Sequence, residues 1–173
     1  MAITKRSARA ILLDGEDLIL IKRTKPGQEP YWVTVGGGVE STDASIKDAL
    51  HREVFEEVGG KLGRTELVYL ISSPADGGVA VQHIFAARLD HMNIEARTGT
   101  EFTRADRGKY DIVRIPFTAE AIRQLALMPT QLRDFMADKH RGDHRSTGYT
   151  ALRIRSPLTP QEDPRDRKNG SCD

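Results

Sequence analysis

The chain has 173 residues, of which 38% are hydrophobic and 29% are charged, and its formal net charge is +1. This length fits a single domain that can bury a sizeable core without disulfides or a structural metal. The near-neutral charge excludes a bulk electrostatic attraction to nucleic acid or to a membrane surface.

Cysteine usage and hydropathy indicate the compartment. Cys172 is the only cysteine, which excludes an internal disulfide framework and a cysteine-based zinc site and is typical of a reducing compartment. The apolar run from Ala10 to Leu13 ends at Asp14, far short of a signal-peptide core. No run approaches the ~18 apolar residues of a membrane-spanning helix. We therefore expect a cytoplasmic protein.

The N-terminal part of the chain predicts three strands. Apolar runs at residues 8–13 and 18–21 flank a Gly15 turn, a pattern typical of a β-hairpin. A loop with two prolines and a glycine follows at residues 25–30. Residues 31–35 are all aromatic or β-branched, and they predict the third strand.

The strongest helix prediction covers residues 43–58. Apolar residues recur there every four positions and form one stripe, made of Ile46, Leu50, Val54 and Val58. Thr42 or Asp43 would cap the start of this helix. The pair Gly59-Gly60 would end it, as a left-handed cap does.

The second half of the chain predicts two further strands, at residues 67–72 and 79–89, joined by a turn at 74–78. A long irregular loop follows at 91–108, then a strand at 110–115 and helices at 118–127 and 130–138. We assign residues 1–140 to one domain. Residues 141–173 are polar and predict a flexible tail, or a strand at 149–154 that packs on the domain or on a neighbouring subunit of a homodimer.

Three acidic residues share one face of the predicted helix. Glu53, Glu56 and Glu57 are related by i, i+3 and i+4. Three neighbouring carboxylates repel one another, and a divalent cation would remove this repulsion, since Mg²⁺ prefers hard oxygen ligands. For the acids taken alone, a solvated helix face is the simpler explanation. We expect their carboxyl groups to converge on one accessible spot beside the glycines that precede the helix.

Those glycines, Gly36-Gly37-Gly38, lie between the third predicted strand and the helix. Three successive glycines cost backbone entropy and need a local reason. Either the backbone approaches a metal or phosphate closely, or the connection between strand and helix is tight.

Taken together, residues 36–60 resemble the Nudix box: glycine, five residues, glutamate, seven residues, then Arg-Glu-aliphatic-x-Glu-Glu-x-Gly-aliphatic. The matching residues are Arg52, Glu53, Val54, Glu56, Glu57 and Gly59. Counting from Gly37 places Asp43 at the first glutamate, with one extra residue before Arg52. Counting from Gly38 restores the spacing but places Ala44 there. We favour the insertion, because the Gly-Gly-Gly-Val-Glu40 run also matches family members. Val35 and Gly60 depart from the residues usual at their positions.

The resemblance implies a Nudix α/β/α sandwich with a mixed β-sheet and a catalytic site on the helix. Glu53, Glu56 and Glu57 would bind Mg²⁺ or Mn²⁺, and the carbonyl of Gly36 or Gly37 would complete the metal shell. Arg52 would hold the carboxylates, or form an ordinary ion pair with Asp48 or Glu56. The implied activity is hydrolysis of a nucleoside diphosphate linked to another moiety. A nucleotide pyrophosphatase and a catalytically inactive, ligand-binding Nudix-like sensor are the alternatives.

Other candidates come from outside the box. Glu40, Glu101 and Asp106 could serve as general base, and Glu101 could contact the substrate, although surface acids are common. Arg23 and Lys22 could meet a phosphate. Tyr31, Trp32 and Phe85 could stack a nucleobase, although strand aromatics are more often in the core. His83 lies in an apolar strand and is better explained as a hydrogen-bonded buried histidine. The substrate's identity cannot be read from these residues.

Overall fold

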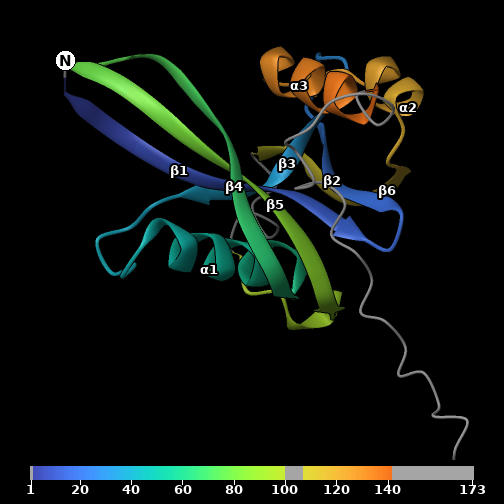
Figure 1. The fold of residues 1–173 in the computed structure, drawn as a ribbon, viewed down its shortest axis with the longest axis horizontal. Coiled ribbons are helices and arrows are strands. Elements are labelled where there is room, and N and C mark those ends of the chain that lie inside the picture. Colours follow the sequence, from blue (N-terminus) through green and yellow to red (C-terminus); the bar gives the residue numbers. More distant parts are fainter. Residues whose placement is uncertain (1, 100–106, 142–173) are drawn as a thin grey trace, which may run out of the picture.

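The computed structural model describes residues 2–99 and 107–141, for the last two of these the backbone only. In chain order its elements are β1 (Ile3–Asp14), β2 (Asp17–Thr24), β3 (Tyr31–Gly38), α1 (Ile46–Val58), β4 (Gly60–Ala75), β5 (Gly78–Met92), the 3₁₀ helix η1 (Ile94–Ala96), β6 (Lys109–Pro116), α2 (Ala119–Gln124), β7 (Leu127–Met128) and α3 (Thr130–Arg141). Helix α1 lies on one side of the sheet, and α2 and α3 lie on the other (Figure 1). This is the expected α/β sandwich.

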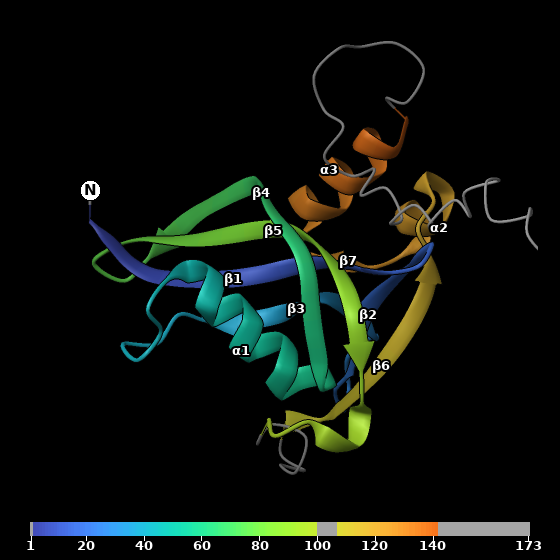
Figure 2. The same cartoon turned by 60° about the horizontal axis from the view of Figure 1, so that its bottom comes forward.

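The seven strands of the described residues form one mixed sheet. Strand β1 runs parallel to β5 over most of its length. On its other edge, β1 pairs with β3 through Ser7–Ala10 and with β2 through Leu12–Asp14, both antiparallel. Strand β6 is antiparallel to β2, and the short β7 is parallel to β3. Strand β1 is therefore a central strand of the sheet, paired along both of its edges (Figure 2).

Both faces of the sheet carry a hydrophobic core, so its central strands are apolar on both sides. On the α1 face, β1 and β2 contribute Ala10, Leu12, Ile19 and Ile21. On the other face, α2 and α3 cover Ile11, Leu13, Leu18 and Leu20. Successive side chains of a strand point to opposite faces, which explains why residues 10–13 and 18–21 are continuous apolar runs.

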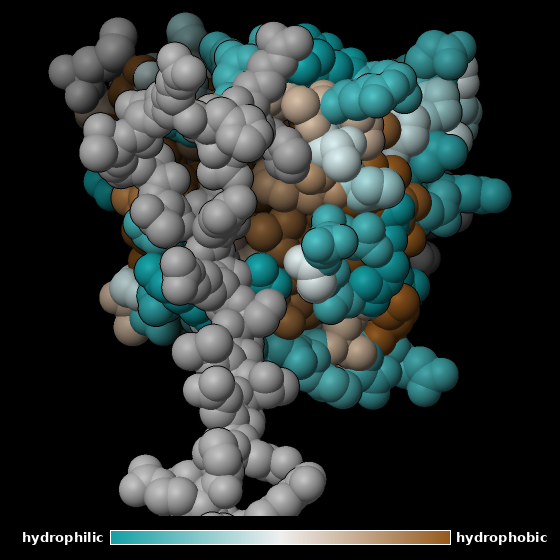
Figure 3. Space-filling view, turned by 45° about the vertical axis from the view of Figure 1, so that its right-hand side comes forward, coloured by the Kyte–Doolittle hydropathy of each residue, from teal (hydrophilic) through white to brown (hydrophobic). Residues whose placement is uncertain are grey.

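Charged and polar residues cover much of the remaining surface. Figure 3 shows hydrophilic residues around the rim of one face and hydrophobic ones nearer its centre. The large hydrophobic side chains that stay exposed include Phe55, Leu67 and Leu70. Within the described residues, no helix is both long enough and apolar enough to span a lipid bilayer.

The start of α1 differs from its prediction. The helix begins at Ile46, and its N-cap is Ser45, whose side chain accepts a hydrogen bond from the Asp48 amide. Neither Thr42 nor Asp43 caps the helix. The Asp43 carboxylate instead accepts hydrogen bonds from Arg52 and from the Glu40 amide. The helix therefore starts three residues later than predicted.

Glycines also occupy different elements from those expected. Gly36, Gly37 and Gly38 are the last residues of β3 and pair with Arg9, Ala8 and Ser7 of β1, so they are strand residues and not a loop. Gly59 does end α1 in the left-handed conformation, with φ of 63°. Gly60 is no part of that cap, because β4 begins there and pairs with Met92.

The remaining boundaries shift because tertiary pairing extends or interrupts local preferences. Strands β4 and β5 form a hairpin longer at both ends than predicted, and η1 lies within the expected loop at 91–108. The helix predicted at 118–127 ends at Gln124, since Leu127 and Met128 pair with β3. The tail was predicted at 141–173; Arg141 is instead the last residue of α3, and residues 142–173 lie outside the described part of the chain.

Candidate active site on helix α1

The three predicted glutamates lie on the side of α1 that faces β3. Glu53 and Glu57 are buried, with 8% and 7% of their surface exposed, whereas the Glu56 side chain keeps 36%. Carboxylates this deep need polar partners, because desolvation of an unpaired charge is costly. The surrounding loop and strand supply such partners.

The glycines of β3 accommodate two of these carboxylates. The Gly36 amide donates a 2.7 Å hydrogen bond to Oε2 of Glu57. A Cβ at position 37 would lie 2.5 Å from Oε2 of Glu53, and a Cβ at position 36 would lie 2.2 Å from the Ala8 carbonyl oxygen. Gly36 also has a φ of 130°, which favours glycine. Gly37 is therefore required by the close approach of α1 to β3, and Gly36 by its positive φ and the adjacent backbone of β1.

Arg52 connects the acidic face to the loop before the helix. Its Nε and Nη2 donate to the two Asp43 carboxylate oxygens, both at 2.9 Å. Its Nη1 lies 3.0 Å from Oε1 of Glu53 and 3.1 Å from Oε2 of Glu56, and Nη2 also donates to the Gly38 carbonyl. Such a fork-to-fork pair fixes a guanidinium in position and orientation, so Asp43 positions Arg52 and Arg52 gathers the glutamates.

The same contacts shift two pKa values. Hydrogen bonds from Arg52, and a second one from the Glu40 amide, lower the pKa of Asp43 from 3.8 to about 2. The hydrogen bonds to Asp43 raise the pKa of Arg52 above its usual value. Both groups are therefore charged at neutral pH. Asp48, the other partner expected for Arg52, instead interacts with the N-cap residue Ser45.

The oxygen atoms of this acidic cluster are suitable ligands for a hard divalent cation. Carboxyl groups outnumber the single guanidinium, and oxygen ligands of this kind suit Mg²⁺ or Mn²⁺. The glutamates do not converge on one point as expected, however, because Arg52 lies between Glu53 and Glu56. In the part of the chain that the structure describes, no three acidic, histidine or cysteine side chains are arranged to hold a metal ion.

Arg23 lies at the far end of β2, where β2 pairs with β3 and β6. Its guanidinium carbon is 3.5 Å from the centre of the Tyr110 ring, and its Nη2 donates to the Arg107 carbonyl. Its Nε is buried and has no hydrogen-bond partner among the described residues. Tyr31 pairs with Arg23 in the sheet register and is half-buried.

The other sequence candidates divide into core and surface residues. Phe85 is buried in the core under α1, as the simpler interpretation held. His83 is half-buried, and its Nδ1 lies 3.2 Å from the Ser7 carbonyl oxygen. The Lys22 ammonium lies 5.6 Å from the Trp32 ring. Glu101 and Asp106 lie outside the described residues.

Glu40 stays close to the cluster. Its side chain is 63% exposed, and its Oε1 is 3.8 Å from Nη1 of Arg52. It therefore remains a candidate general base. The residue that sequence reasoning missed as a positioning group is Asp43, and the available signal was an acid at the first glutamate position of the box.

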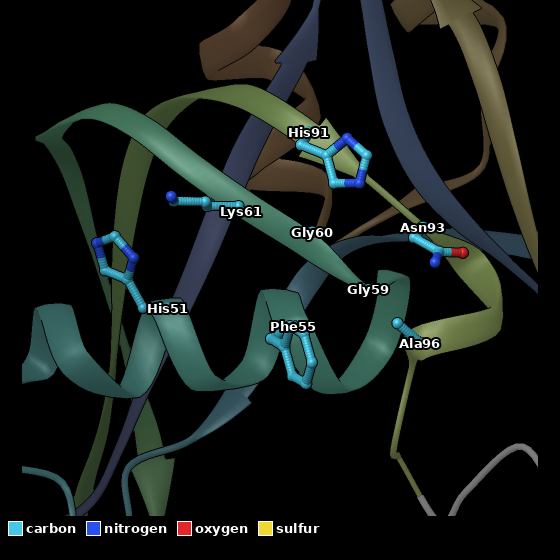
Figure 4. Close-up of a pocket in the computed structure, with 8 residues that line it drawn as sticks. All are labelled: His51, Phe55, Gly59, Gly60, Lys61, His91, Asn93 and Ala96. Carbon is cyan, nitrogen blue, oxygen red and sulfur yellow. The ribbon is translucent and has the colours of Figure 1, made fainter.

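A pocket of about 430 Å³ lies next to α1 but does not include these acids. It is lined by His51 and Phe55 of α1 together with residues of β4, β5 and η1 (Figure 4). Successive residues of a helix are 100° apart, so His51 and Phe55 face away from the buried Glu53 and Glu57. This pocket is a separate feature.

Solved structures with similar folds include three informative ones. A NUDIX hydrolase from Nitrosomonas europaea has a TM-score of 0.59 at 17% identity, covering 80% of this chain and 89% of its own. A MutT NUDIX hydrolase from Burkholderia pseudomallei has a TM-score of 0.54 at 20% identity, covering 78% and 95%. The NUDIX domain of Shewanella oneidensis NrtR, complexed with ADP ribose, has a TM-score of 0.56 at 16% identity, covering 82% and 90%. These similarities show the fold.

Sequence comparison gives the family. No curated protein is similar enough to match. The family model of the NUDIX domain, in contrast, matches residues 4–138, most of the chain and nearly all of its described part. With the box residues gathered on α1 and the matching fold, the chain belongs to the Nudix hydrolase family.

Proposed function

We propose that this protein hydrolyses a nucleoside diphosphate linked to another moiety, in a reaction that depends on Mg²⁺ or Mn²⁺. The observation that carries the proposal is the cluster on α1, where Arg52 contacts Glu53 and Glu56 and the Gly36 amide binds Glu57. A buried acidic cluster beside strand backbone suits a metal that binds phosphate oxygens.

The metal ligands in this proposal are Glu53, Glu56, Glu57 and the carbonyl of Gly36 or Gly37. A divalent cation bound there would neutralise the phosphate charge and lower the pKa of a coordinated water. Nη1 of Arg52 donates hydrogen bonds to Glu53 and Glu56 and so fixes their relative positions. The hydrogen bonds from Arg52 to Asp43 in turn fix the position of Nη1. When a cation binds, we expect Arg52 to keep Asp43 and give up part of its contact with the glutamates.

Substrate contacts are proposed for Arg23, Tyr31 and Glu101. The stacked guanidinium of Arg23 has a buried Nε–H without a partner in the described residues, and a donor in this condition would gain by pairing with a substrate oxygen. Tyr31 offers a half-buried ring beside it. Glu101 rests on the sequence alone. Glu40, Asp106 or a box glutamate would act as general base.

A hydrolysis screen tests the function. The full chain is incubated with Mg²⁺ and a panel of ADP-ribose, nucleotide sugars, dinucleoside polyphosphates and deoxynucleoside triphosphates, and products are separated by chromatography. We expect a nucleoside monophosphate from one substrate of the first two classes, and no turnover with a chelator. Turnover of dinucleoside polyphosphates or triphosphates alone would instead identify the nucleotide pyrophosphatase alternative.

Glu57→Gln tests the metal face. Glutamine keeps an acceptor oxygen for the Gly36 amide but removes the charge, so we expect turnover to fall by at least about 10²-fold with little change in melting temperature. Glu66→Gln is the matched control, because Glu66 lies on β4 and its side chain is 43% exposed. Near-normal turnover of Glu57→Gln would reject the catalytic assignment while leaving the fold unaffected.

A ligand-binding sensor is the second candidate. It is favoured by the similarity to the NrtR domain that was complexed with ADP ribose, and by the position of Arg52 between two of the proposed ligands. Calorimetry with ADP-ribose, followed by chromatography of the same sample, separates the two. Binding without any hydrolysis across the panel would establish the sensor.

Assembly and location also remain predictions. We expect a cytoplasmic protein that binds small nucleotides and neither membranes nor nucleic acid, with a homodimer as one assembly to test. Light scattering during gel filtration of the full chain gives the mass of the particle directly. A single monomer mass at micromolar concentration would reject the dimer.

A further inference from the structure

The pocket on the other side of α1 has a basic character of its own. His51 comes from α1, Lys61 from the first residues of β4, and His91 from the last residues of β5. Figure 4 shows the Lys61 side chain extending toward His51, with His91 on the neighbouring strand. No acidic side chain of the described residues lines this pocket.

Basic side chains lie next to one another at the edge of this pocket. Lys61 and His91 are direct cross-strand neighbours in the β4–β5 pairing, a position where an acid opposite the lysine would stabilise the pair. Arg114 and Arg64, in contrast, have the acidic partners Asp14 and Glu66. The described residues provide no such ion pair for Lys61. An anion between the three basic groups would supply the missing counter-charge.

The pocket also offers an aromatic surface. Phe55 lines it and keeps 46% of its surface exposed, which is high for a side chain of this size beside a core helix. Gly59 and Gly60 add no side chains beside it, so the ring stays accessible. A planar ligand could stack on Phe55 while an attached anion reaches Lys61. The volume of about 430 Å³ is within the usual range for small-molecule sites.

The end of α1 would oppose an anion if its carbonyls were free, because a helix C-terminus carries partial negative charge. Several of these carbonyls are already occupied. The Gly59 amide donates to the carbonyls of Phe55 and Val54, and the Gly99 amide donates to that of Glu56. These hydrogen bonds reduce the partial negative charge that the end of α1 presents to the pocket.

We propose that this basic pocket, defined by His51, Phe55, Lys61 and His91, is a second, non-catalytic site that binds a nucleoside phosphate. The phosphate lies between Lys61 and the two imidazoles, and the base stacks on Phe55. The site shares α1 with the acidic cluster but uses the opposite side of the helix. It does not depend on the function proposed for Glu53, Glu56 and Glu57.

NMR titration of the ¹⁵N-labelled full chain with AMP, in the presence of a chelator, tests this site. AMP has no diphosphate bond, so hydrolysis does not interfere. We expect amide shifts to concentrate at Phe55, Lys61 and His91, and Lys61→Ala to weaken binding by about tenfold or more, as loss of a charged hydrogen-bond donor would. Lys47→Ala, an exposed lysine of α1 outside the pocket, is the matched control.

Separate titrations with inorganic phosphate and with adenosine measure how much the phosphate group and the base each contribute to the affinity for AMP. We expect each to bind more weakly than AMP, and Phe55→Leu to weaken AMP without affecting phosphate. Shifts confined to the Arg52 and Arg23 side, or unchanged AMP binding by Lys61→Ala, would overturn the site. Phosphate that binds as tightly as AMP would overturn its assignment to a nucleotide.

Discussion

At the scale of single residues, the three glycines of β3 have separate roles. Gly37 faces the Glu53 carboxylate, Gly36 faces the backbone of β1, and a Cβ at Gly38 would meet nothing within 4 Å. An added methyl group therefore has three different consequences within three consecutive residues. Sequence reasoning expected a local reason for all three glycines, and the structure gives one for Gly36 and Gly37 only. The sequence alone could not separate a ligand contact from tight packing of strand against helix.

We expect Gly37→Ala to reduce turnover far more than stability. Its Cβ would lie 2.5 Å from Glu53 Oε2, and the carboxylate, the movable end of a side chain, would shift away from Arg52. Gly38→Ala is the matched control with normal activity, and Gly36→Ala should lose stability, because its Cβ meets backbone at a φ of 130°. Rates and thermal melts of all three variants check this. A large fall in melting temperature for Gly37→Ala, with normal specific activity, would contradict it.

Asp43 gives a pH dependence that can be measured. Its pKa is lowered from 3.8 to about 2 in the folded chain, so its ionised form stabilises the fold above 3.8, and this stabilisation is lost as the pH falls toward about 2. We expect Asp43→Asn to be less stable than the wild type at neutral pH, with the difference shrinking across that interval. Urea unfolding at several pH values between about 5 and 2 measures it. A constant difference across this interval would mean that the charge of Asp43 does not stabilise the fold.

At the scale of elements, the sequence periodicity predicted helix α1 correctly, but the predicted start of the helix was wrong. The apolar stripe and the acidic spacing depend only on the 3.6-residue repeat, so both were confirmed as features of one helix. The N-cap was wrong because Thr42, Asp43 and Ser45 are all competent caps, and the choice depends on Arg52 holding Asp43. Asp43 and Arg52 are nine residues apart in the sequence, so a local sequence pattern cannot predict their contact.

The predicted lengths of β4 and β5 were wrong for a similar reason. The exposed parts of β4 and β5 lack a clear alternation, and they are strands because each pairs with the other along a long hairpin. The two residues of β7 are in the sheet because β3 is beside them. Such elements are products of tertiary pairing, which outweighs local propensity.

The C-terminal cap of α1 offers a controlled test of backbone strain. Gly59 and Gly15 have nearly equal φ values of 63° and 62°, but a Cβ at Gly59 would lie 1.8 Å from the Asn93 carbonyl oxygen, whereas one at Gly15 would meet nothing within 4 Å. Gly15→Ala should therefore cost only the left-handed strain, about 1–2 kcal/mol, and Gly59→Ala should cost clearly more. Urea unfolding of both variants compares them, and equal losses would mean that η1 moves aside freely.

At the scale of the whole molecule, the sheet separates two cores that have different relations to the site. The sequence predicted a sandwich through the resemblance of its box, but nothing in the apolar runs told which helix covers which face. The structure places α1 alone over the core that contains Leu50 and Val54, and α2 and α3 over the core that contains Leu132. Only the first core lies directly beneath the acidic cluster.

This arrangement predicts that equal cavities have unequal effects on activity. Leu50 and Leu132 are both 0% exposed, so Leu50→Ala and Leu132→Ala should each lower the free energy of unfolding by about 2–5 kcal/mol. Leu50→Ala should also lower turnover, because α1 would shift toward the cavity and change the positions of Glu53 and Glu57 relative to Gly37 and Gly36. Leu132→Ala should keep normal turnover in its folded fraction.

Urea unfolding and rate assays, both well below the melting temperatures, separate the two quantities. A single unfolding transition in each variant would show that the two cores unfold together across the shared sheet. If Leu50→Ala kept full turnover despite its lost stability, the position of α1 over β3 would not control the site, and the close packing at Gly36 and Gly37 would serve folding alone. If Leu132→Ala lost turnover as well, the sheet would transmit the displacement from one core to the other.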